Sequence, residues 1–546
     1  MGVLAVYDTV GIQSYIFASN KLAENVGASK LVAGVFDRGG MLEEAIKEHT
    51  KIEDLPDWTK PGVLSSKLPV EIIYQGGGNA YVKFKNENLR DIDGKLISDE
   101  HLFNDVTKTF LINIAKNAPG IGVAVAAIET DFEGSYKEDF DNINNRLLIT
   151  KGGFNMPVFA GNQPITKQSG RTGQPADTVD DGEFLNVTQM KKREKYKKLK
   201  NDKDIESKQF DDLAFEKHED SLIAIIHADG NNMGKDIKEY MQSSESYSEA
   251  VPRMRELSSK IAKCYKKALD TTAMAFEKAY VSYLENLDKK PKDGKIKLPM
   301  LRLIDDGDDI TVLVGGRFAI DFAVRLLREI EKTPPKERPF GEKSNPPTAC
   351  AGVVLFHSHY PFSEAYGLAE GLCKFAKGPS RLTGKSYIDF HLHGQGNVAG
   401  LGQLRAKQYV VDGKSIICRP WMVSRDTDCM TSENHTIKTE ETSYPTGTPN
   451  ICWFEKEMPY ISGLPKNKTK AIRNAIGTGD VVAELAVNRL IDVYLPTNPT
   501  MKKRNPEDKA NPNKTPRSKY AAIFDLLEFQ DAYVNLLNKP EVQDGV

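Results

Sequence analysis

Residues 301–314 read LRLIDDGDDITVLV, in which two apolar runs enclose the acidic turn Asp305–Asp309. Asp306-Gly307 is a strong signal for a two-residue β-hairpin, because such turns need positive backbone φ angles. The pattern predicts a hairpin, with arms Leu301–Ile304 and Ile310–Val314, that projects four aspartates from one end of a sheet. Carboxylates this close repel one another, and protons or a bound cation must offset the repulsion. The turn is therefore a candidate site for Mg²⁺ and nucleotide phosphates, with a surface turn that binds nothing as the alternative.

Asp229 stands at the end of a second apolar strand, Ser221–His227, and is followed by a turn rich in glycine and asparagine. If this strand lies beside the hairpin, Asp229 points toward Asp308. Two carboxylates on adjacent strands, with backbone carbonyls of the following turn, commonly hold two metal ions in phosphoryl or nucleotidyl transfer. Backbone N–H groups of Gly230–Gly234, at the start of a helix, are suited to a triphosphate. An EF-hand is excluded, because its twelfth position would be Tyr240 instead of a glutamate.

The predicted elements occur twice in one order: strand, helix, hairpin, helix and strand. In the first half they fall at Val3–Tyr7, Ile12–Leu31, Pro69–Tyr74 with Ala80–Phe84, Leu102–Ala118 and Gly122–Ile128. In the second half they fall at Ser221–His227, Val251–Leu287, the acidic hairpin, Arg317–Lys332 and Thr348–Leu355, followed by a helix at Pro361–Lys377 and a strand at Ser386–Phe390. The first hairpin turns at Gln75–Asn79, through glycines instead of aspartates. We therefore expect an α+β fold with two tandem ferredoxin-like βαββαβ units.

Length and composition divide the chain further. At 546 residues it needs several cores, and we expect units at 1–150 and 221–395, a connector at 151–220 and a mainly helical unit at 396–546. The net charge of -2 gives no global basic field for nucleic acid. The connector contains a basic run, Lys191–Lys200, which predicts a solvated helix, with nucleic-acid contact as the alternative. The six cysteines are scattered without a CxxC pair, and no stretch reads as a signal peptide or membrane span, so we expect a cytoplasmic protein.

A second glycine-containing segment is a further candidate for phosphate binding. Gly378, Gly384, Lys385 and Ser386 resemble a Walker A loop, but five residues separate the glycines instead of four, and the segment runs from helix to strand. A P-loop is therefore excluded. Lys377 and Lys385 are candidates to reach a triphosphate from this segment, and two solvated lysines are the alternative. No Ser/His/Asp or Cys/His pairing for nucleophilic catalysis stands out in the sequence.

Five motifs carry a resemblance to a known family, in this order: Tyr7–Phe17 (YDTVGIQSYIF), Gly27–Ser29, Gly76–Asn79, His227–Lys235 (HADGNNMGK) and Asp306–Asp309. Together they resemble the large subunit of type III CRISPR effector complexes, which has two palm domains. Later stretches resemble the rest of its second palm, at Ala351–Val354, Tyr360-Pro361 and Ser386–His391. The resemblance covers most of residues 1–395. It implies a second palm like GGDEF nucleotide cyclases, which joins ATP by 3′–5′ linkages into cyclic oligoadenylates that activate antiviral effectors.

The resemblance also implies roles for particular residues. Asp229, Gly230 and Asp308 would hold two Mg²⁺ or Mn²⁺ ions, and Asp309 would assist at the 3′-hydroxyl of the substrate, ATP. The nucleotides would lie against Asn231, Asn232, Met233, Gly234, Asp306, Gly307, Lys377 and Lys385 of the second palm and Gly76, Gly77, Gly78 and Asn79 of the first, which would take an acceptor nucleotide without an acidic pair of its own. Expected partners are nucleoside triphosphates, a downstream effector reached through the cyclic nucleotide, and RNA or CRISPR-like subunits, with no membrane.

Departures from the family pattern leave two hypotheses open. Asn231 replaces the second aspartate of the family's Asp-x-Asp-Asn turn, and Asp306 replaces the first glycine of Gly-Gly-Asp-Asp. Residues Gln163–Ala176 look like the family's zinc-knuckle region without its cysteines, and no N-terminal HD nuclease domain is expected, so the chain resembles a standalone or divergent relative. The favoured hypothesis is an enzyme that makes a cyclic di- or oligonucleotide in antiphage defence. The alternative is a catalytically degenerate, nucleotide-binding palm scaffold in a CRISPR-like ribonucleoprotein complex. A GGDEF-type diguanylate cyclase is less favoured, because two palms in one chain would not need the usual homodimer.

Overall fold

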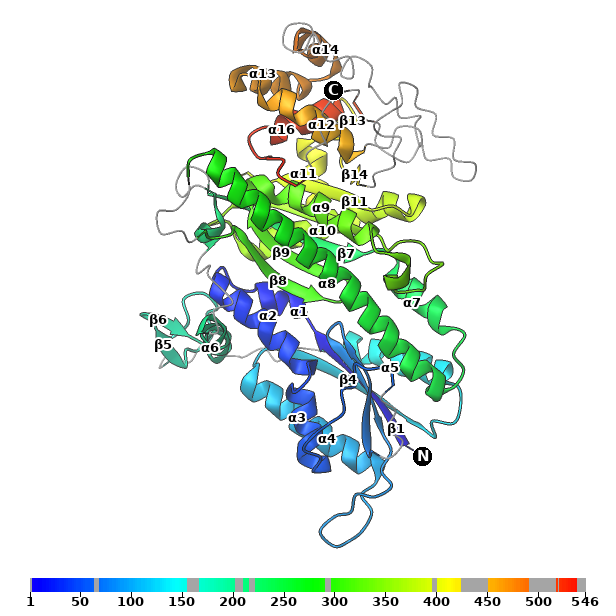
Figure 1. Cartoon of the computed structure of the whole chain (residues 1–546). Coiled ribbons are helices and arrows are strands. Elements are labelled where there is room, and N and C mark those ends of the chain that lie inside the picture. The colour runs from blue at the N-terminus through cyan, green and yellow to red at the C-terminus, as the bar shows by residue number, and fades with distance from the viewer. Residues whose placement is uncertain are drawn as a thin grey trace.

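The computed structural model describes residues 2–62, 68–154, 166–201, 210–215, 221–289, 296–394, 400–423, 450–490, 517–518 and 520–537. Two main sheets organise the chain (Figure 1). The N-terminal sheet lies at the bottom of the view, the second sheet lies above it, and the helices of the C-terminal part lie at the top. The chain is thus a mixture of helices and strands, as the sequence predicts.

The first sheet has four antiparallel strands in the order β2-β3-β1-β4. Its strands are β1 (Gly2–Val10), β2 (Val70–Gly76), β3 (Asn79–Phe84) and β4 (Gly122–Thr130), and its helices are α1 (Ile12–Phe17), α2 (Leu22–Phe36), α3 (Met41–Thr50), α4 (Asp99–Asn117) and α5 (Tyr136–Gly152). Side chains alternate along β1, so that Ala5 and Tyr7 join the core formed with α2, α3 and α4, whereas Leu4 and Val6 join the core formed with α5. The sheet therefore buries both of its faces.

The single helix predicted at Ile12–Leu31 is instead two helices, α1 and α2. The chain leaves the helical path between them, where the hydroxyl of Ser19 accepts a hydrogen bond from the backbone N–H of Lys21. A short serine side chain that bonds to nearby backbone competes with helix propagation, which accounts for the interruption. The prediction of one continuous helix was therefore wrong.

The second sheet has six strands in the order β14-β11-β10-β7-β9-β8. Its strands are β7 (Leu222–Gly230), β8 (Met300–Asp306), β9 (Asp309–Gly315), β10 (Ala349–His357), β11 (Tyr387–Leu392) and β14 (Trp421–Met422). Only β10 and β11 pair in parallel, and the other neighbours pair antiparallel. The order β10-β7-β9-β8 repeats the order β4-β1-β3-β2 of the first sheet.

Helices cover both faces of the second sheet. They are α7 (Met233–Met241), α8 (Tyr247–Asn286), α9 (Ala319–Glu331), α10 (Phe362–Thr383) and α11 (Leu401–Gln408). Ala224, Ile226 and Ala228 of β7 pack with α8 and α9, whereas Ile223 and Ile225 pack with α10. The long helix α8 also extends to the first sheet (Figure 1), where the buried Arg255 donates to the backbone carbonyls of Ile72 and Ile73 and pairs with Glu71.

The C-terminal part is mainly helical. It contains α12 (Ile451–Ser462), α13 (Lys466–Ile476), α14 (Asp480–Arg489), α16 (Ala521–Phe529) and the short strands β12 (Val410–Val411) and β13 (Lys414–Ser415). The buried guanidinium of Arg419 pairs with Asp525 and Glu528 of α16 and so joins this part to the edge of the second sheet. Among the described residues, five cysteines are free thiols and no helix is long and apolar enough to cross a membrane; Cys429 lies outside those residues.

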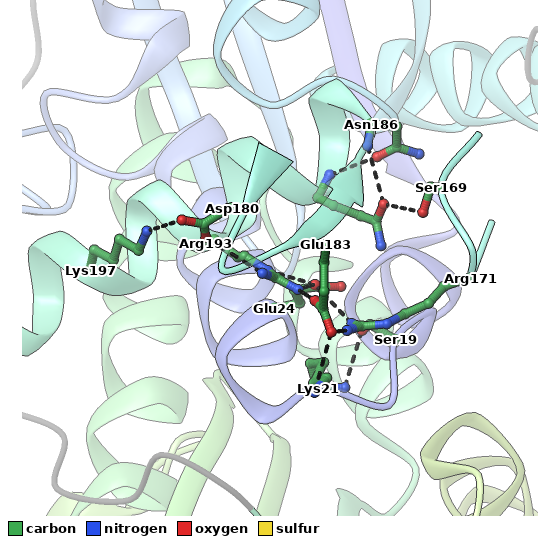
Figure 2. A network of polar contacts seen from close by, with 11 residues as sticks. Ser19, Lys21, Glu24, Ser169, Arg171, Asp180, Glu183, Asn186, Arg193 and Lys197 are labelled. Atoms are coloured by element: carbon green, nitrogen blue, oxygen red, sulfur yellow. Dashed lines mark hydrogen bonds and ion pairs between the residues drawn. The ribbon is translucent and has the colours of Figure 1, made fainter. Parts of the chain in front are cut away.

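The connector packs on the first unit through a network of charged residues (Figure 2). It contributes a small hairpin of β5 (Thr178–Asp180) and β6 (Glu183–Leu185), and α6 (Val187–Asn201). The basic run was predicted to form a solvated helix, and this is only partly correct, because one face of α6 lies against α2. Lys192 is buried and donates to the backbone carbonyl of Tyr15, and a Cβ on Gly27 would come within 1.9 Å of the Lys192 carbonyl oxygen. Glycine at position 27 is therefore what allows the two helices to approach so closely.

Candidate metal and nucleotide site

The acidic hairpin forms between β8 and β9, but its turn is one residue later than the sequence predicts. Asp306 pairs with Asp309, so the two central residues are Gly307 and Asp308 instead of Asp306 and Gly307. The pairing of β8 with β9 shifts by one residue between Arg302 and Ile304, and after this shift the hairpin closes on Gly307 and Asp308. Gly307 has φ 62° and provides the positive φ that the first central position of a tight hairpin turn requires.

The hairpin brings its carboxylates beside β7. Asp229 is the register partner of Asp309, and the side chain of Asp308 lies over the backbone of Gly230. A Cβ on Gly230 would stand 2.8 Å from Oδ2 of Asp308 and 2.7 Å from the hydroxyl oxygen of Tyr265. Position 230 must therefore be glycine if Asp308 is to lie this close to the strand that carries Asp229.

A pocket of ≈ 340 Å³ opens at this end of the sheet. It is lined by Asp229, Gly230, Asn231, Asn232, Met233, Gly234, Lys235, Asp308, Lys377, Ser380 and Arg381. The first residues of α7 supply backbone N–H groups and, with Lys235, Lys377 and Arg381, form a wall of the pocket that Asp229 and Asp308 also line. Such a wall favours an anionic ligand, because helix N-termini and basic side chains both attract phosphate.

Ser380 and Arg381 were not predicted from the sequence. They follow Lys377 by three and four residues on α10, the spacing that places side chains on one helix face. The spacing from Lys377 indicates Ser380 and Arg381 as neighbours on the helix, whereas the resemblance to a Walker A loop pointed to Lys385. Lys385 lines neither this pocket nor the smaller one beside it.

The pKa values of Asp308 and Asp309 lie above the ordinary range of an aspartate. Burial, followed by the charge of Asp229, raises the pKa of Asp308 to about 6. Burial, followed by the charges of Asp229 and Asp308, raises the pKa of Asp309 to about 8. Among the cationic lining residues, Lys377 forms an ion pair with Asp229, and its Nζ lies 2.5 Å from Oδ2. The hydrogen bond and charge of Asp229 outweigh the burial of Lys377, and the pKa of the ammonium is raised.

These shifts predict that chelator-treated protein loses stability as the pH rises. The pKa of Asp309 is higher in the folded than in the unfolded protein. Its contribution to the free energy of unfolding is therefore fully present below about pH 4 and is lost as the pH rises through about 8. The side chain of Asp309 keeps 37% of its surface exposed, so solvent screens the effect to no more than about 1 kcal/mol. Melting temperatures of wild type and Asp309→Asn should agree at pH 5, and the variant should melt higher at pH 8.5. An equal difference in melting temperature between the two proteins at both pH values would contradict the raised pKa of Asp309.

A second pocket of ≈ 140 Å³ lies on the other side of Asp229. Its lining comprises Gln13, His227, Asp229, Asp309, Glu370, Cys373, Lys374 and Lys377. Nδ1 of the buried His227 is 3.4 Å from Oδ1 of Asp309 and 3.3 Å from the hydroxyl of Thr311. Burial lowers the pKa of His227. The imidazole therefore lies close to Asp309 in the smaller pocket without a hydrogen bond to Oδ1 of that carboxylate.

The glycine hairpin of the first sheet meets the acidic hairpin of the second. Gly76 pairs with Asn79, and both central residues, Gly77 and Gly78, have positive φ. The backbone N–H of Gly77 donates to Oδ1 of Asp306 at 3.4 Å. Asp306 lines neither pocket, so its carboxylate faces the first sheet instead of the phosphate-binding wall.

The residues around Asp229 and Asp308 suit a hard divalent cation. Among the described residues, no three protein ligands of the His, Cys, Asp or Glu type converge on one point. Mg²⁺ does not need such a cluster, because it commonly binds one or two carboxylates together with substrate phosphates and water. Two carboxylates, the Gly230 carbonyl and an anion-binding wall are present together, and Oδ1 of Asp309 is buried without a hydrogen-bond partner. The donor set therefore fits the metal.

Comparison with known proteins places this site in a family. Residues 222–383 match the family model described as Cas10/Cmr2, second palm domain. This part of the chain is similar to a Cas10-type palm domain. The matched range begins with the first residue of β7 and ends with the last residue of α10, so the palm contains Asp229, the acidic hairpin and Lys377. The resemblance to palm-domain subunits of type III CRISPR systems is thereby confirmed.

Solved structures of Cas10-type proteins resemble the whole chain more loosely. Csm1 of T. onnurineus is 12% identical with a TM-score of 0.46, and the match covers 97% of this chain and 69% of that one. A Csm1–Csm4 cassette in complex with cA4 is 13% identical with a TM-score of 0.45 and the same coverage. A Csm1–Csm4 cassette in complex with AMPPNP is 12% identical with a TM-score of 0.39, and the match covers 71% of this chain but 54% of that one. No curated protein matches the chain significantly.

Proposed function

We propose that the chain is a metal-dependent nucleotidyltransferase that joins nucleoside triphosphates, with ATP as the expected substrate, by 3′–5′ linkage into a cyclic di- or oligonucleotide. One observation carries the proposal: Asp229 and Asp308 line the same pocket as the N-terminus of α7 and the cationic side chains of Lys235, Lys377 and Arg381. Nucleotidyl transfer needs carboxylates for metal and cations for phosphate at the same place. Both occur here within the palm domain.

Each side chain has a defined task in this proposal. Asp229, Asp308 and the carbonyl of Gly230 would hold Mg²⁺ or Mn²⁺, which polarises the transferred phosphorus and lowers the pKa of the attacking hydroxyl. The N–H groups of Gly230–Gly234 and the ammonium and guanidinium groups of the wall bind and orient the triphosphate. Asp309 lies beside Asp229, and its buried Oδ1 accepts no hydrogen bond, so it would be placed to accept the 3′-hydroxyl proton.

We further propose that the two sheets are tandem ferredoxin-like palms. Their shared strand order supports this, as does the contact between the Gly77 hairpin and Asp306. The first palm would bring the acceptor nucleotide to the donor in the second through Gly76, Gly77, Gly78 and Asn79. The unit boundaries at 150, 220 and 395, and association with other CRISPR subunits or RNA, belong to the same proposal.

The alternative function is a palm scaffold that binds nucleotide without turnover, and the substitutions Asn231 and Asp306 favour it. The position of both side chains weakens that argument. Asp306 faces Gly77, outside the phosphate-binding pocket. The amide nitrogen of Asn231 donates to Thr348, so this side chain fastens the turn to the start of β10. Neither substitution removes the carboxylates of Asp229 and Asp308.

A direct assay separates the two functions. Purified protein is incubated with Mg²⁺ or Mn²⁺ and each of the four nucleoside triphosphates, and the products are analysed by mass spectrometry after phosphatase treatment. We expect a phosphatase-resistant product from ATP that disappears when EDTA is added. Binding of a non-hydrolysable ATP analogue without any product, in the presence or absence of other subunits and RNA, would support the scaffold instead.

A further inference from the structure

The ammonium of Lys377 occupies a position that the proposed function assigns to a metal ion. Its Nζ lies 2.5 Å from Oδ2 of Asp229 and 3.2 Å from the backbone carbonyl oxygen of Gly230. A carboxylate oxygen and a neighbouring backbone carbonyl are ligands for a hard cation, and these two are the ligands proposed for the metal. The lysine side chain is 21% exposed and therefore lies mostly inside the pocket wall.

The first sheet contains the same ion pair at the equivalent place. Asp8 on β1 is the register partner of Asn79, as Asp229 on β7 is the partner of Asp309. Nζ of Lys151 lies 2.7 Å from Oδ1 of Asp8. Lys151 and Lys377 stand at the same position counted from the first residues of α5 and α10, which follow the equivalent strands β4 and β10. The fold therefore supplies a lysine counter-ion to the strand-end aspartate of each sheet.

The two places differ in what else can ligate a cation. In the first sheet Gly78 and Asn79 stand where the second has Asp308 and Asp309. A side chain at Gly78 would be strained, because the φ angle is +77° and a Cβ there would stand 2.5 Å from Cδ1 of Ile12 and 2.6 Å from the Thr9 hydroxyl oxygen. Asp8 thus has no second carboxylate beside it from this hairpin, and Lys151 is a sufficient partner. Asp229 has two further carboxylates, which a single ammonium leaves uncompensated.

Lysine and metal cannot share Asp229 without a cost. A divalent cation on the same carboxylate and carbonyl would stand within contact distance of the ammonium, and like charges that close repel strongly. Lys377 must therefore leave before metal binds. A triphosphate in the adjacent pocket offers the ammonium a new anionic partner, because Lys377 lines that pocket together with Ser380 and Arg381.

We propose that Lys377 is a surrogate cation that holds the metal position of the ligand-free site and transfers to the triphosphate, so that metal and nucleotide bind cooperatively. This inference rests on the proposed function. The chain would bind a divalent ion weakly alone and tightly with its substrate. Reciprocity requires the metal to strengthen nucleotide binding by the same factor.

Affinity for Mn²⁺, followed by the electron paramagnetic resonance signal of the free ion, tests the proposal without turnover. With no nucleotide and at one fixed pH, Lys377→Met should bind Mn²⁺ at least about tenfold more tightly than wild type, within the usual range of coupling between sites. Lys377→Arg keeps the positive charge and should bind Mn²⁺ as weakly as wild type. Lys151→Met is the matched control, because it removes the equivalent lysine from a place without further carboxylates, and its Mn²⁺ affinity should equal that of wild type.

Adding a non-hydrolysable ATP analogue completes the test. It should raise the Mn²⁺ affinity of wild type more than that of Lys377→Met. The inference would be overturned if Lys377→Met bound Mn²⁺ no more tightly than wild type. It would also be overturned if Lys151→Met gained as much Mn²⁺ affinity as Lys377→Met. The double variant Asp308→Asn/Lys377→Met distinguishes this failure from failure of the proposed function. If tight Mn²⁺ binding persists in that variant, the metal is not at Asp308 and the function proposed for this site is wrong.

Discussion

Replacement of Asp308 by asparagine should lower the rate of product formation by at least about 10²–10³-fold while the protein stays folded. A metal ion contributes several kcal/mol to the stabilisation of transition-state charge, and each 1.36 kcal/mol changes a rate tenfold. Asparagine keeps the shape of the side chain but cannot supply the anionic oxygen. Because the pKa of Asp308 is raised to about 6, mainly by burial, a neutral side chain should be accommodated well. Melting temperature in chelator should therefore be unchanged or higher as activity falls.

Asp305 offers a matched control in the same hairpin. It pairs with Ile310 near the turn, lines neither pocket, and its carboxylate lies 3.8 Å from the guanidinium of Arg302. Asp305→Asn should keep activity within about twofold, since exposed ion pairs contribute little. Product is quantified by mass spectrometry at saturating Mg²⁺ and ATP for both variants. Full activity of Asp308→Asn, or an equal loss in Asp305→Asn, would remove Asp308 from the proposed metal site.

The position of this site was open to prediction because it depends on local patterns. The run of aspartates around Gly307 and the apolar strand before Asp229 are each visible within about ten residues. Strand alternation then brings their ends together, and the structure places Asp229 beside Asp309 in register. The prediction placed the turn one residue too early, because the register of β8 against β9 depends on packing and cannot be read from local composition. Roles in catalysis for these residues remain predictions.

Long-range contacts were beyond the sequence. Nothing near Lys377 in the chain indicates that its ammonium would lie on Asp229, and Asp306 gives no local sign that it would face Gly77. The connector shows the same limit. The spacing of Lys191–Lys200 predicted only a charged helix, since the residues that contact its buried face come from α1 and α2, more than 150 positions earlier along the chain. Sequence pattern therefore identified the residue types at the site but not their partners.

The connector's ion-pair network yields the second large prediction (Figure 2). Glu24 of α2 is fully buried and accepts from the guanidinium groups of Arg193, at 2.9 Å, and Arg171, at 3.2 Å; both arginines also pair with Glu183. Glu24 thus fastens α6 and the β5–β6 hairpin to the first unit, in a region that has no cysteines to hold a metal. Removing one member of a buried ion pair costs about 3–5 kcal/mol. Both arginines keep Glu183 as a partner, so we expect the lower end of this range here.

Glu24→Gln should therefore weaken the docking of the connector by about 3 kcal/mol, which corresponds to more than about a hundredfold faster hydrogen exchange of the α6 amides. Lys21→Met is the control within the same network, because Lys21 is 54% exposed and lies 3.7 Å from Glu183. An exposed pair of this kind contributes at most about 1 kcal/mol, so α6 exchange should change by less than about fivefold.

Exchange is followed by mass spectrometry of peptides from α6 and, as an internal reference, from β7. Equal acceleration in both variants, or acceleration in β7 as large as in α6, would show that Glu24 does not hold the connector. We therefore expect Glu24→Gln, but not Lys21→Met, to lose hydrogen-exchange protection, and only in α6. The two variants differ because Glu24 is buried, whereas solvent screens the charge of Lys21.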